Sequence, residues 1–194
     1  MLGDLMDKLL VIVFAYAWLG VEAYNQIQQR RRRDSTAPPA DRGSLARLYA
    51  CIAIGYGVAI AASFAPFGRL PGEQPLWLVA GAALIACGLW IRHVAMRTLA
   101  RFFTYQVEIR ADHQLVETGP YRRIRHPGYL GQLLVFAGVG VALANWMSIA
   151  AMIVFTFAGF RWRIGVEEAA LQARFADQFE TYRRRTWRLI PWLY

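Results

Sequence analysis

A polar stretch between two hydrophobic segments carries most of the residues in this chain that could do chemistry. The stretch from His113 to Gly131 reads HQLVETGPYRRIRHPGYLG. Six of its side chains can bind charged groups or exchange protons: His113, Glu117, Tyr121, Arg125, His126 and Tyr129. Its Gly-Pro and Pro-Gly pairs restrict the backbone to a few turn geometries. We therefore expect a functional site to be built on this loop.

Pro127 marks the start of a helix at the end of the loop. Proline is favoured in the first turn of a helix because its missing N–H is not needed there. The positive end of the helix dipole and the free N–H groups of the first turn would then face the loop. That arrangement suits a carboxylate. An ordinary helix start with an interfacial His126 and Tyr129 is the alternative.

A second charged group follows further along the chain, at Arg163, Glu167 and Glu168. Arg163 and Glu167 are four residues apart, so they share one face of a helix. A simple ion pair on that face is one interpretation. Beside the loop, however, the guanidinium could bind an anionic group and the carboxylate a cationic group of one ligand.

Motifs of several common chemistries are absent from the sequence. It contains no P-loop, HExxH, CxxC or GxSxG motif, and no GxGxxG motif follows a strand. The three histidines lack the spacing of metal ligands, so we predict no metal site. Cys51 and Cys87 lie in hydrophobic segments and indicate no disulfide. The net charge of +9 is better explained by membrane topology and anionic lipids than by nucleic acid, which we exclude as a partner.

The loop sequence resembles a known family of membrane enzymes. The run Leu115-Val116-x-x-Gly119-x-Tyr121-x-x-x-Arg125-His126-Pro127-x-Tyr129-x-Gly131 closely resembles the isoprenylcysteine carboxyl methyltransferases. These belong to a superfamily of integral-membrane methyltransferases that includes the phospholipid N-methyltransferases. The continuation Arg163-x-x-x-Glu167-Glu168-x-x-Leu171-x-x-x-Phe175, with Tyr182 and Pro191, is similar to theirs as well.

The resemblance implies that S-adenosyl-L-methionine binds in a cytoplasmic pocket formed by the loop, the last two spans and the C-terminal helix. By position, the residues expected to contact this cofactor are Gln106, His113, Gln114, Leu115, Val116, Tyr121, His126, Pro127, Gly128, Tyr129 and Glu167. Arg163 would face the methyl acceptor, so Arg163 and Glu167 are the expected catalytic residues. Two positions depart from the family pattern: Ala176 stands where a glycine is common, and Phe179 where a tyrosine is common.

The expected activity is methylation of a membrane-embedded or lipophilic acceptor, most like protein-S-isoprenylcysteine carboxyl O-methylation. A phosphatidylethanolamine amine and a small thiol are alternative acceptors. An amine would need a base, for which Glu168 and His126 are the candidates. An NADPH-dependent membrane reductase and a non-enzymatic membrane adaptor are the alternatives from other functional classes.

Hydrophobic segments must position these residues, since 57% of the chain is hydrophobic. A bilayer core of roughly 30 Å needs about 20 apolar residues as a helix. We predict spans at about 8–26, 47–66, 76–94, 127–144 and 146–163. The expected fold is thus an all-α integral membrane protein with five transmembrane helices, forming one domain over 1–194. Its motif-bearing catalytic part covers about 104–191.

Three further expectations concern the packing of these elements. Small residues in the second and third spans predict that these two helices pack together. An amphipathic helix over Glu167–Tyr182 is predicted to pack back over the loop. Glu22 falls near the inner end of the first span, where its carboxylate either reaches water or pairs within the membrane.

Charge placement predicts the orientation. Only Lys8 and Arg69 of the 22 Lys and Arg residues fall on one side of a five-span arrangement. The positive-inside rule then places the N-terminus outside and both the loop and the C-terminus in the cytoplasm. Because the five-span form is like that of the small prokaryotic members of the family, we expect a bacterial or archaeal cytoplasmic membrane.

Overall fold

The computed structural model describes residues 6, 9, 11, 13, 17, 20–22, 24, 27, 28, 41, 43–105 and 114–194. Within these residues the protein is helical and has no strand, only two isolated β-bridges, Arg69–Asn145 and Ile124–Trp187. Most of the predicted first span lies outside the described residues, as do the predicted site residues Gln106 and His113.

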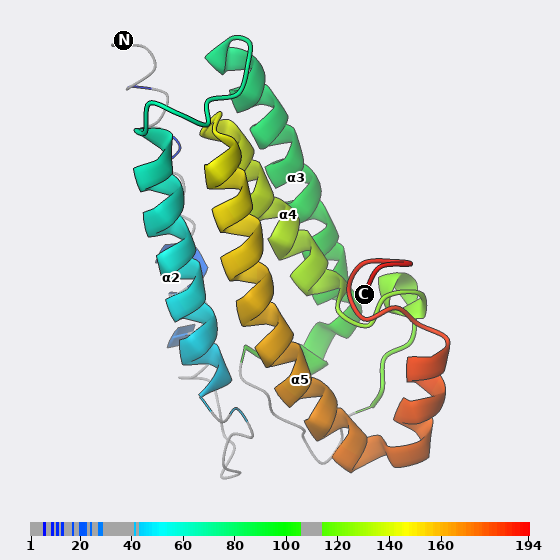
Figure 1. Ribbon diagram of the computed structural model, residues 1–194. Helices are drawn as coiled ribbons and strands as arrows, with labels where there is room; N and C mark the ends of the chain where they lie inside the picture. The colour runs from blue at the N-terminus through cyan, green and yellow to red at the C-terminus, as the bar shows by residue number, and fades with distance from the viewer. Residues whose placement is uncertain are drawn as a thin grey trace.

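Four long helices lie side by side (Figure 1): α2 (Ser44–Ser63), α3 (Gln74–Leu99), α4 (Pro127–Ala142) and α5 (Trp146–Arg184). Two short 3₁₀ helices complete the described elements, η1 (Ala100–Phe102) after α3 and η2 (Gly119–Arg122) in the loop before α4. The helix α3 packs on α4, α4 packs on α5, and α5 packs on α2.

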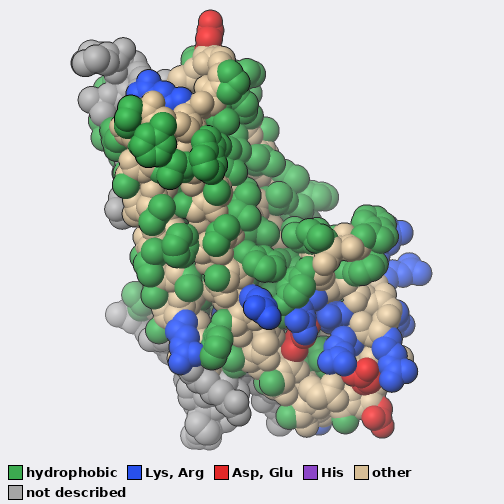
Figure 2. Space-filling model, viewed as in Figure 1, with side chains coloured by type: hydrophobic (Ala, Val, Ile, Leu, Met, Phe, Trp, Pro, Cys, Tyr) green, Lys and Arg blue, Asp and Glu red, His purple; other side chains and the backbone are tan. Residues whose placement is uncertain are grey.

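Three of the helices, α2, α3 and α5, are long and apolar enough to cross a membrane. Hydrophobic side chains cover the helical body, whereas Lys and Arg gather at its lower end and on the adjoining lobe (Figure 2). The chain is an integral membrane protein. The fourth helix, α4, has 16 residues and is about 24 Å long at 1.5 Å per residue, so it is shorter than a full span.

Glycines bring α3 and α4 into backbone contact. A Cβ added to Gly81 would come within 2.5 Å of the Gly138 carbonyl oxygen, and a Cβ on Gly138 within 2.7 Å of the Gly81 oxygen. Gly55 of α2 instead faces Phe155 of α5. The prediction that the second and third spans pack together is therefore wrong. Small residues allow close approach to a neighbouring helix, but they do not specify which helix that is.

The last helix continues well beyond its predicted span. α5 covers 39 residues, but it consists of two helical segments that meet at a kink at Ala176, where φ is 41° and ψ is −112°. Beyond this kink the helix turns back beneath the loop (Figure 1). There Phe179 and Tyr182 are buried, and the Tyr182 hydroxyl donates to the Tyr121 carbonyl at 2.7 Å. The predicted amphipathic segment thus packs against the loop, and the kink at Ala176 lies inside it.

The C-terminal tail closes over the same loop. The Arg125 amide donates to the Trp187 carbonyl at 2.8 Å, and the Trp187 amide donates to the Arg123 carbonyl at 2.9 Å. The His126 amide donates to the Arg188 carbonyl at 3.2 Å. These backbone bonds fix the residues that lead into α4, and so they fix where the loop's side chains point.

Candidate functional site

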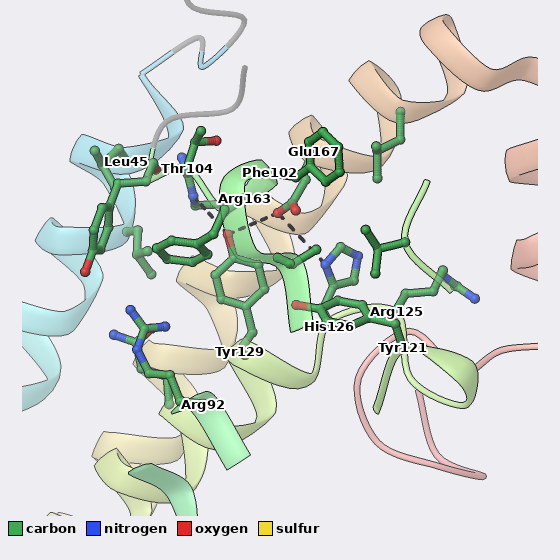
Figure 3. Close-up of a pocket in the computed structure, with 18 of the residues that line it drawn as sticks. Leu45, Arg92, Phe102, Thr104, Tyr121, Arg125, His126, Tyr129, Arg163 and Glu167 are labelled. Atoms are coloured by element: carbon green, nitrogen blue, oxygen red, sulfur yellow. Dashed lines mark hydrogen bonds and ion pairs between the residues drawn. The ribbon is translucent and has the colours of Figure 1, made fainter. Parts of the chain in front are cut away.

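One pocket lies where the loop, the start of α2, the end of α3, the start of α4 and the middle of α5 meet (Figure 3). Nine of the residues expected at the site line it: Gln114, Leu115, Val116, Tyr121, His126, Gly128, Tyr129, Arg163 and Glu167. Pro127 does not line the pocket; it is the first residue of α4, as predicted. These nine residues, which lie up to 53 positions apart in the sequence, thus meet in one cavity.

The Tyr129 hydroxyl joins the two predicted catalytic side chains. It donates to Glu167 Oε2 at 3.1 Å and accepts from Arg163 Nε at 3.1 Å. Arg163 and Glu167 share a helix face as predicted, but they meet at this hydroxyl and not at each other (Figure 3). The Tyr129 ring is held between Phe160 and His126, with centroid distances of 5.0 and 5.7 Å.

The start of α4 closes the pocket beside Glu167. His126 occupies the position before Pro127, and no side chain caps the first turn. His126 is buried, with Nδ1 3.9 Å from Glu167 Oε2 and Nε2 3.3 Å from Glu168 Oε1. Because the first-turn N–H groups are uncapped by side chains, this end of the helix favours a negatively charged group in the pocket.

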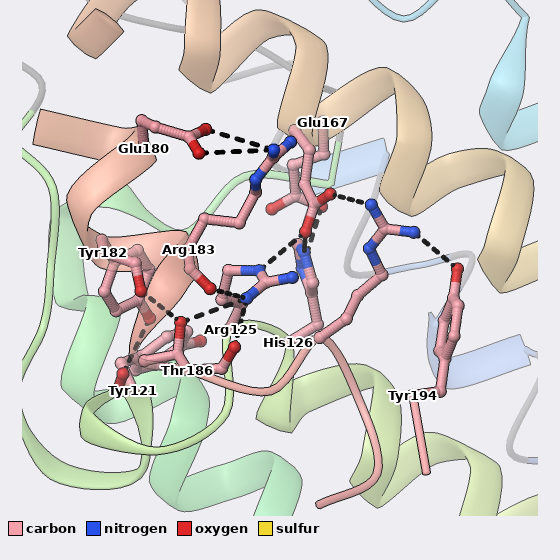
Figure 4. Close-up of polar contacts among 11 residues, drawn as sticks. Tyr121, Arg125, His126, Glu167, Glu180, Tyr182, Arg183, Thr186 and Tyr194 are labelled. Carbon is pink, nitrogen blue, oxygen red and sulfur yellow. Dashed lines mark hydrogen bonds and ion pairs between the residues drawn. The ribbon is translucent and has the colours of Figure 1, made fainter. Parts of the chain in front are cut away.

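Glu168 lies in an ion cluster behind the pocket wall. Arg125 Nε donates to its Oε1 at 2.9 Å and Arg188 Nη2 to its Oε2 at 2.6 Å. The Arg125 guanidinium also donates to Thr186 and to the Arg183 carbonyl, and Arg188 donates to the Tyr194 hydroxyl (Figure 4). We call Arg125, Glu168, Thr186 and Arg188 the clamp, because they tie the loop and the tail to α5.

The clamp keeps Glu168 ionised. Burial by itself would raise the pKa of this carboxyl, but the hydrogen bonds and charges of His126, Arg188 and Arg125 outweigh burial and lower the pKa to about 2. Glu168 also does not line the pocket. A carboxylate with so low a pKa and three partners is a poor proton acceptor, which disfavours Glu168 as the base considered for an amine acceptor.

Asp41 and Ser44 hold Arg163 from the side of α2, and the sequence patterns did not indicate either of them. Arg163 Nη1 donates to Asp41 Oδ1 and, at 2.7 Å, to Ser44 Oγ; Nη2 donates to the Tyr105 carbonyl. Burial would raise the pKa of Asp41, but hydrogen bonds from Arg163 and from the Leu45 amide lower it. Arg163 is therefore a buried guanidinium with a fixed orientation at the pocket wall.

The opposite end of the pocket lies deeper among the helices. Arg92 of α3 donates to Glu22 Oε1 at 2.8 Å and to Gln132 Oε1 of α4 at 3.1 Å, and all three side chains are buried. Arg92 falls near the end of the predicted span at about 76–94. The structure places it inside the helical body, where Glu22 is its partner. The alternative in which Glu22 pairs within the membrane is therefore the correct one.

Apolar side chains form much of the remaining lining. They come from α2, from the segment around η1 and from the two parts of α5: Leu45, Leu48, Ile52, Leu99, Phe102, Phe103, Leu171 and Phe179. The pocket therefore combines a polar wall with an apolar one. Among the described residues, no group of His, Cys, Asp and Glu is arranged to hold a metal ion. The same part of the chain contains both cysteines, and both are free thiols.

Known proteins are similar to this chain in sequence. A probable protein-S-isoprenylcysteine O-methyltransferase of rice (Oryza sativa subsp. indica) is 32% identical over 127 residues, which cover 63% of this chain and 66% of that protein. Protein-S-isoprenylcysteine O-methyltransferase A of Arabidopsis thaliana is 37% identical over 116 residues, covering 58% of this chain and 59% of its own length. The chain thus spans about two thirds or less of the length of these relatives.

A solved structure has a similar fold. It is that of the eukaryotic intramembrane Ras methyltransferase, isoprenylcysteine carboxyl methyltransferase; the TM-score is 0.57 at 24% identity, covering 79% of this chain and 51% of that chain. The profile of the phospholipid methyltransferase family matches residues 76–178, more than half of the chain. That match runs from the first turn of α3 past the kink of α5 and includes most of the residues that line the pocket. Because the match covers more than half of the sequence, the chain belongs to the phospholipid methyltransferase family.

Proposed function

We propose that this protein is an S-adenosyl-L-methionine-dependent methyltransferase that acts on a lipophilic acceptor, most like protein-S-isoprenylcysteine carboxyl O-methylation. The relatives from rice and Arabidopsis carry that activity in their names. Those names favour an isoprenylcysteine acceptor over a phosphatidylethanolamine amine or a small thiol. They equally disfavour an NADPH-dependent reductase and a non-enzymatic adaptor.

A single observation carries the proposal. The pocket places a carboxylate, a phenol and a guanidinium in one hydrogen-bonded row, from Glu167 through Tyr129 to Arg163. An apolar wall from α2 and η1 lines the same cavity. A charged methyl donor and a greasy acceptor with a polar end need this combination in adjoining space, because methyl transfer depends mainly on proximity and alignment.

The donor half of the pocket suits the groups of S-adenosyl-L-methionine. Glu167 offers a carboxylate for a cationic group, and the uncapped start of α4 suits a carboxylate. Leu115 and Val116 line the pocket nearby and offer apolar surface for a flat purine. We propose that Gln106 and His113, which lie outside the described residues, complete this half.

The acceptor half is assigned to Arg163 and the apolar wall. When bound, S-adenosyl-L-methionine supplies an electrophilic methyl group, so an acceptor carboxylate needs only to be held in line. Arg163 would hold that carboxylate, which is already ionised at neutral pH and requires no base. The carbon–sulfur bond breaks as the carbon–oxygen bond forms, giving a methyl ester and S-adenosylhomocysteine. Full turnover of Arg163→Ala with unchanged acceptor affinity would rule this role out.

We also propose the topology that follows from the charges. Five spans would place the N-terminus outside and the pocket at the cytoplasmic side of a bacterial or archaeal membrane. The gathering of Lys and Arg at the pocket end of the described helices supports this orientation (Figure 2). The whole chain would form one membrane domain with its catalytic part at about 104–191.

Calorimetric titration of the purified protein tests the cofactor. We expect S-adenosyl-L-methionine and S-adenosylhomocysteine to bind at micromolar concentrations and NADPH to give no heat. Glu180→Gln, at an ion pair with the exposed Arg184 and outside the pocket lining, is the matched control and should bind as the wild type does. Binding of NADPH in place of the methyl donor would overturn the proposal in favour of a reductase.

A second measurement identifies the acceptor class. The protein is incubated with methyl-labelled cofactor and either N-acetyl-S-farnesylcysteine or phosphatidylethanolamine vesicles, and the products are separated by mass spectrometry. We expect a base-labile methyl ester on the farnesylcysteine. A methylated amine on the phospholipid would retain the methyltransferase and replace its acceptor.

A further inference from the structure

Glu22 presents an unused hydrogen-bond acceptor to the pocket. Its side chain is buried, with a residue exposure of 4%, and it lines the cavity. Oε1 accepts from Arg92 at 2.8 Å, whereas Oε2 is buried without a hydrogen-bond partner. A buried carboxylate oxygen without a donor is unfavourable, and this one lies at the edge of a space that a ligand can fill.

Arg92 and Gln132 hold Glu22 in place. The Arg92 guanidinium donates hydrogen bonds to Glu22 Oε1 and to Gln132 Oε1. All three side chains line the pocket, and Arg92 is labelled in Figure 3. The pair carries no net charge, so it can lie among the helices without attracting a bulk counter-ion. The remaining lone pairs of Oε2 are directional, and they select a donor group by position.

The surroundings of Glu22 match this role. Tyr105 also lines the pocket, and burial, the negative charge of Glu22 and a side-chain hydrogen bond to Glu22 raise the pKa of its phenol. The Tyr105 carbonyl accepts from Arg163. Tyr105 therefore contacts the guanidinium that is assigned to the acceptor carboxylate, and Glu22, Tyr105 and Arg163 all line the same pocket.

We propose that Glu22, positioned by Arg92 and Gln132, is a specificity-determining residue that accepts a hydrogen bond from an N–H group of the methyl acceptor. The acceptor would then carry an amide close to its reacting carboxylate, as a peptide-linked or acylated cysteine does. A simple lipid carboxylate lacks that donor and is bound less well. This inference rests on the proposed methyltransferase function and deepens it by specifying the acceptor.

Two probes that differ in the amide test the inference. N-acetyl-S-farnesylcysteine carries the amide, and S-farnesyl-3-mercaptopropionate has the same chain and carboxylate without it. Their dissociation constants for the full-length protein are measured by calorimetry in the presence of S-adenosylhomocysteine, which requires no turnover; their KM and kcat values are measured separately. For the wild type we expect about tenfold tighter binding of the amide probe, as for a hydrogen bond to a charged group.

The variant Glu22→Gln should lose this preference. It keeps the shape of the side chain but removes the charge, so the amide probe should bind about tenfold more weakly while the other probe is unchanged. The effect should fall on KM and not on kcat. Glu22→Gln leaves the Arg92 guanidinium without its carboxylate partner. The double variant Glu22→Gln with Arg92→Gln removes that guanidinium as well, and it should show the same loss of preference for the amide probe. Unchanged affinity for S-adenosylhomocysteine verifies that each variant is folded, and Glu180→Gln is the matched control.

The outcomes separate the inference from the function on which it rests. Equal binding of the two probes by the wild type, or a preference that survives Glu22→Gln, overturns the inference even where both probes are methylated. A Glu22-dependent binding preference without methyl transfer supports the subsite and overturns the proposed reaction. Binding of neither probe overturns both.

Discussion

Glu167 and Glu168 are neighbours in the sequence, but they lie in two different regions of the molecule. The Glu167 side chain is 33% exposed, lines the pocket and accepts a hydrogen bond from Tyr129. The Glu168 side chain is 8% exposed and is held by Arg125 and Arg188 of the clamp and by His126. Because successive residues of a helix point about 100° apart, one carboxylate faces a ligand space and the other faces the tail.

The difference teaches that one helix turn serves two purposes. The pocket wall keeps a carboxylate with spare hydrogen-bonding capacity, which is what a ligand site needs. In the clamp, both carboxylate oxygens of Glu168 already accept hydrogen bonds, so this side chain stabilises the contact between the loop, the tail and α5. Changes in the clamp should therefore act on folding, and changes in the wall should act on binding.

The largest effect is expected from Glu168→Ala. This change leaves the guanidiniums of Arg125 and Arg188 without their carboxylate, and breaking a buried ion pair costs about 3–5 kcal/mol. Denaturant unfolding of the protein in detergent micelles should show that loss. The control Glu180→Ala, at an exposed pair with Arg184, should cost at most about 1 kcal/mol. Equal losses in the two variants would contradict the clamp.

A pH titration of stability should sharpen the assignment of Glu168. Its pKa is about 2 in the native protein against an ordinary value of 4.5, so the native state binds this proton more weakly than the unfolded state. The stabilisation is complete above pH 4.5 and declines as the pH falls toward 2. As the pH falls through that range, the difference in unfolding free energy between the wild type and Glu168→Gln should shrink by about 3 kcal/mol. Parallel curves would show that the ion cluster is absent in solution.

The matching change in the wall, Glu167→Gln, should affect binding. It removes a charge that faces the cavity, and a hydrogen bond to a charged group is worth about 1.5–3 kcal/mol. Calorimetry should therefore show about 10- to 100-fold weaker binding of S-adenosyl-L-methionine with little change in unfolding free energy. If Glu167→Gln destabilised the protein as strongly as Glu168→Ala does, the distinction between wall and clamp would be wrong.

Tyr129→Phe should have a smaller effect in the same direction. The ring keeps its contacts with Phe160 and His126, but the hydroxyl that joins Arg163 to Glu167 is lost. We expect kcat/KM for a farnesylcysteine acceptor to fall about fivefold, the equivalent of about 1 kcal/mol. Tyr56→Phe, a buried tyrosine of α2 outside the pocket lining, is the control. Identical kinetics of the two variants would remove Tyr129 from the site.

The smallest effect is expected at the kink of α5. Ala176 has φ 41°, a conformation that glycine adopts without the steric cost of a Cβ. The glycine common at this position in the family fits that backbone. Ala176→Gly should therefore raise the unfolding free energy by about 0.5–1 kcal/mol, measured in detergent. A loss of stability would show that the helix is straight at this position in solution.

Sequence reasoning named nine of the residues that line the pocket, because those nine come from two compact motifs. The loop motif and the Arg163–Glu167 pair lie on elements whose local geometry follows from proline position and helical spacing. It did not find Asp41, Ser44 or the Arg92–Gln132 contact. These residues belong to no motif, and each acts through a partner on another helix. The wrong pairing of the second and third spans has the same origin.

The sequence by itself determined that this is a helical membrane protein and determined which side chains share each helix face. Hydrophobic length and a period of 3.6 residues are local properties, so they can be deduced from the chain alone. Only the tertiary structure decided which face meets which helix. It turned Glu167 toward the cavity and Glu168 toward the tail, and it brought Glu22 to Arg92, because the rotation of each helix is set by its packing against neighbours distant in the sequence.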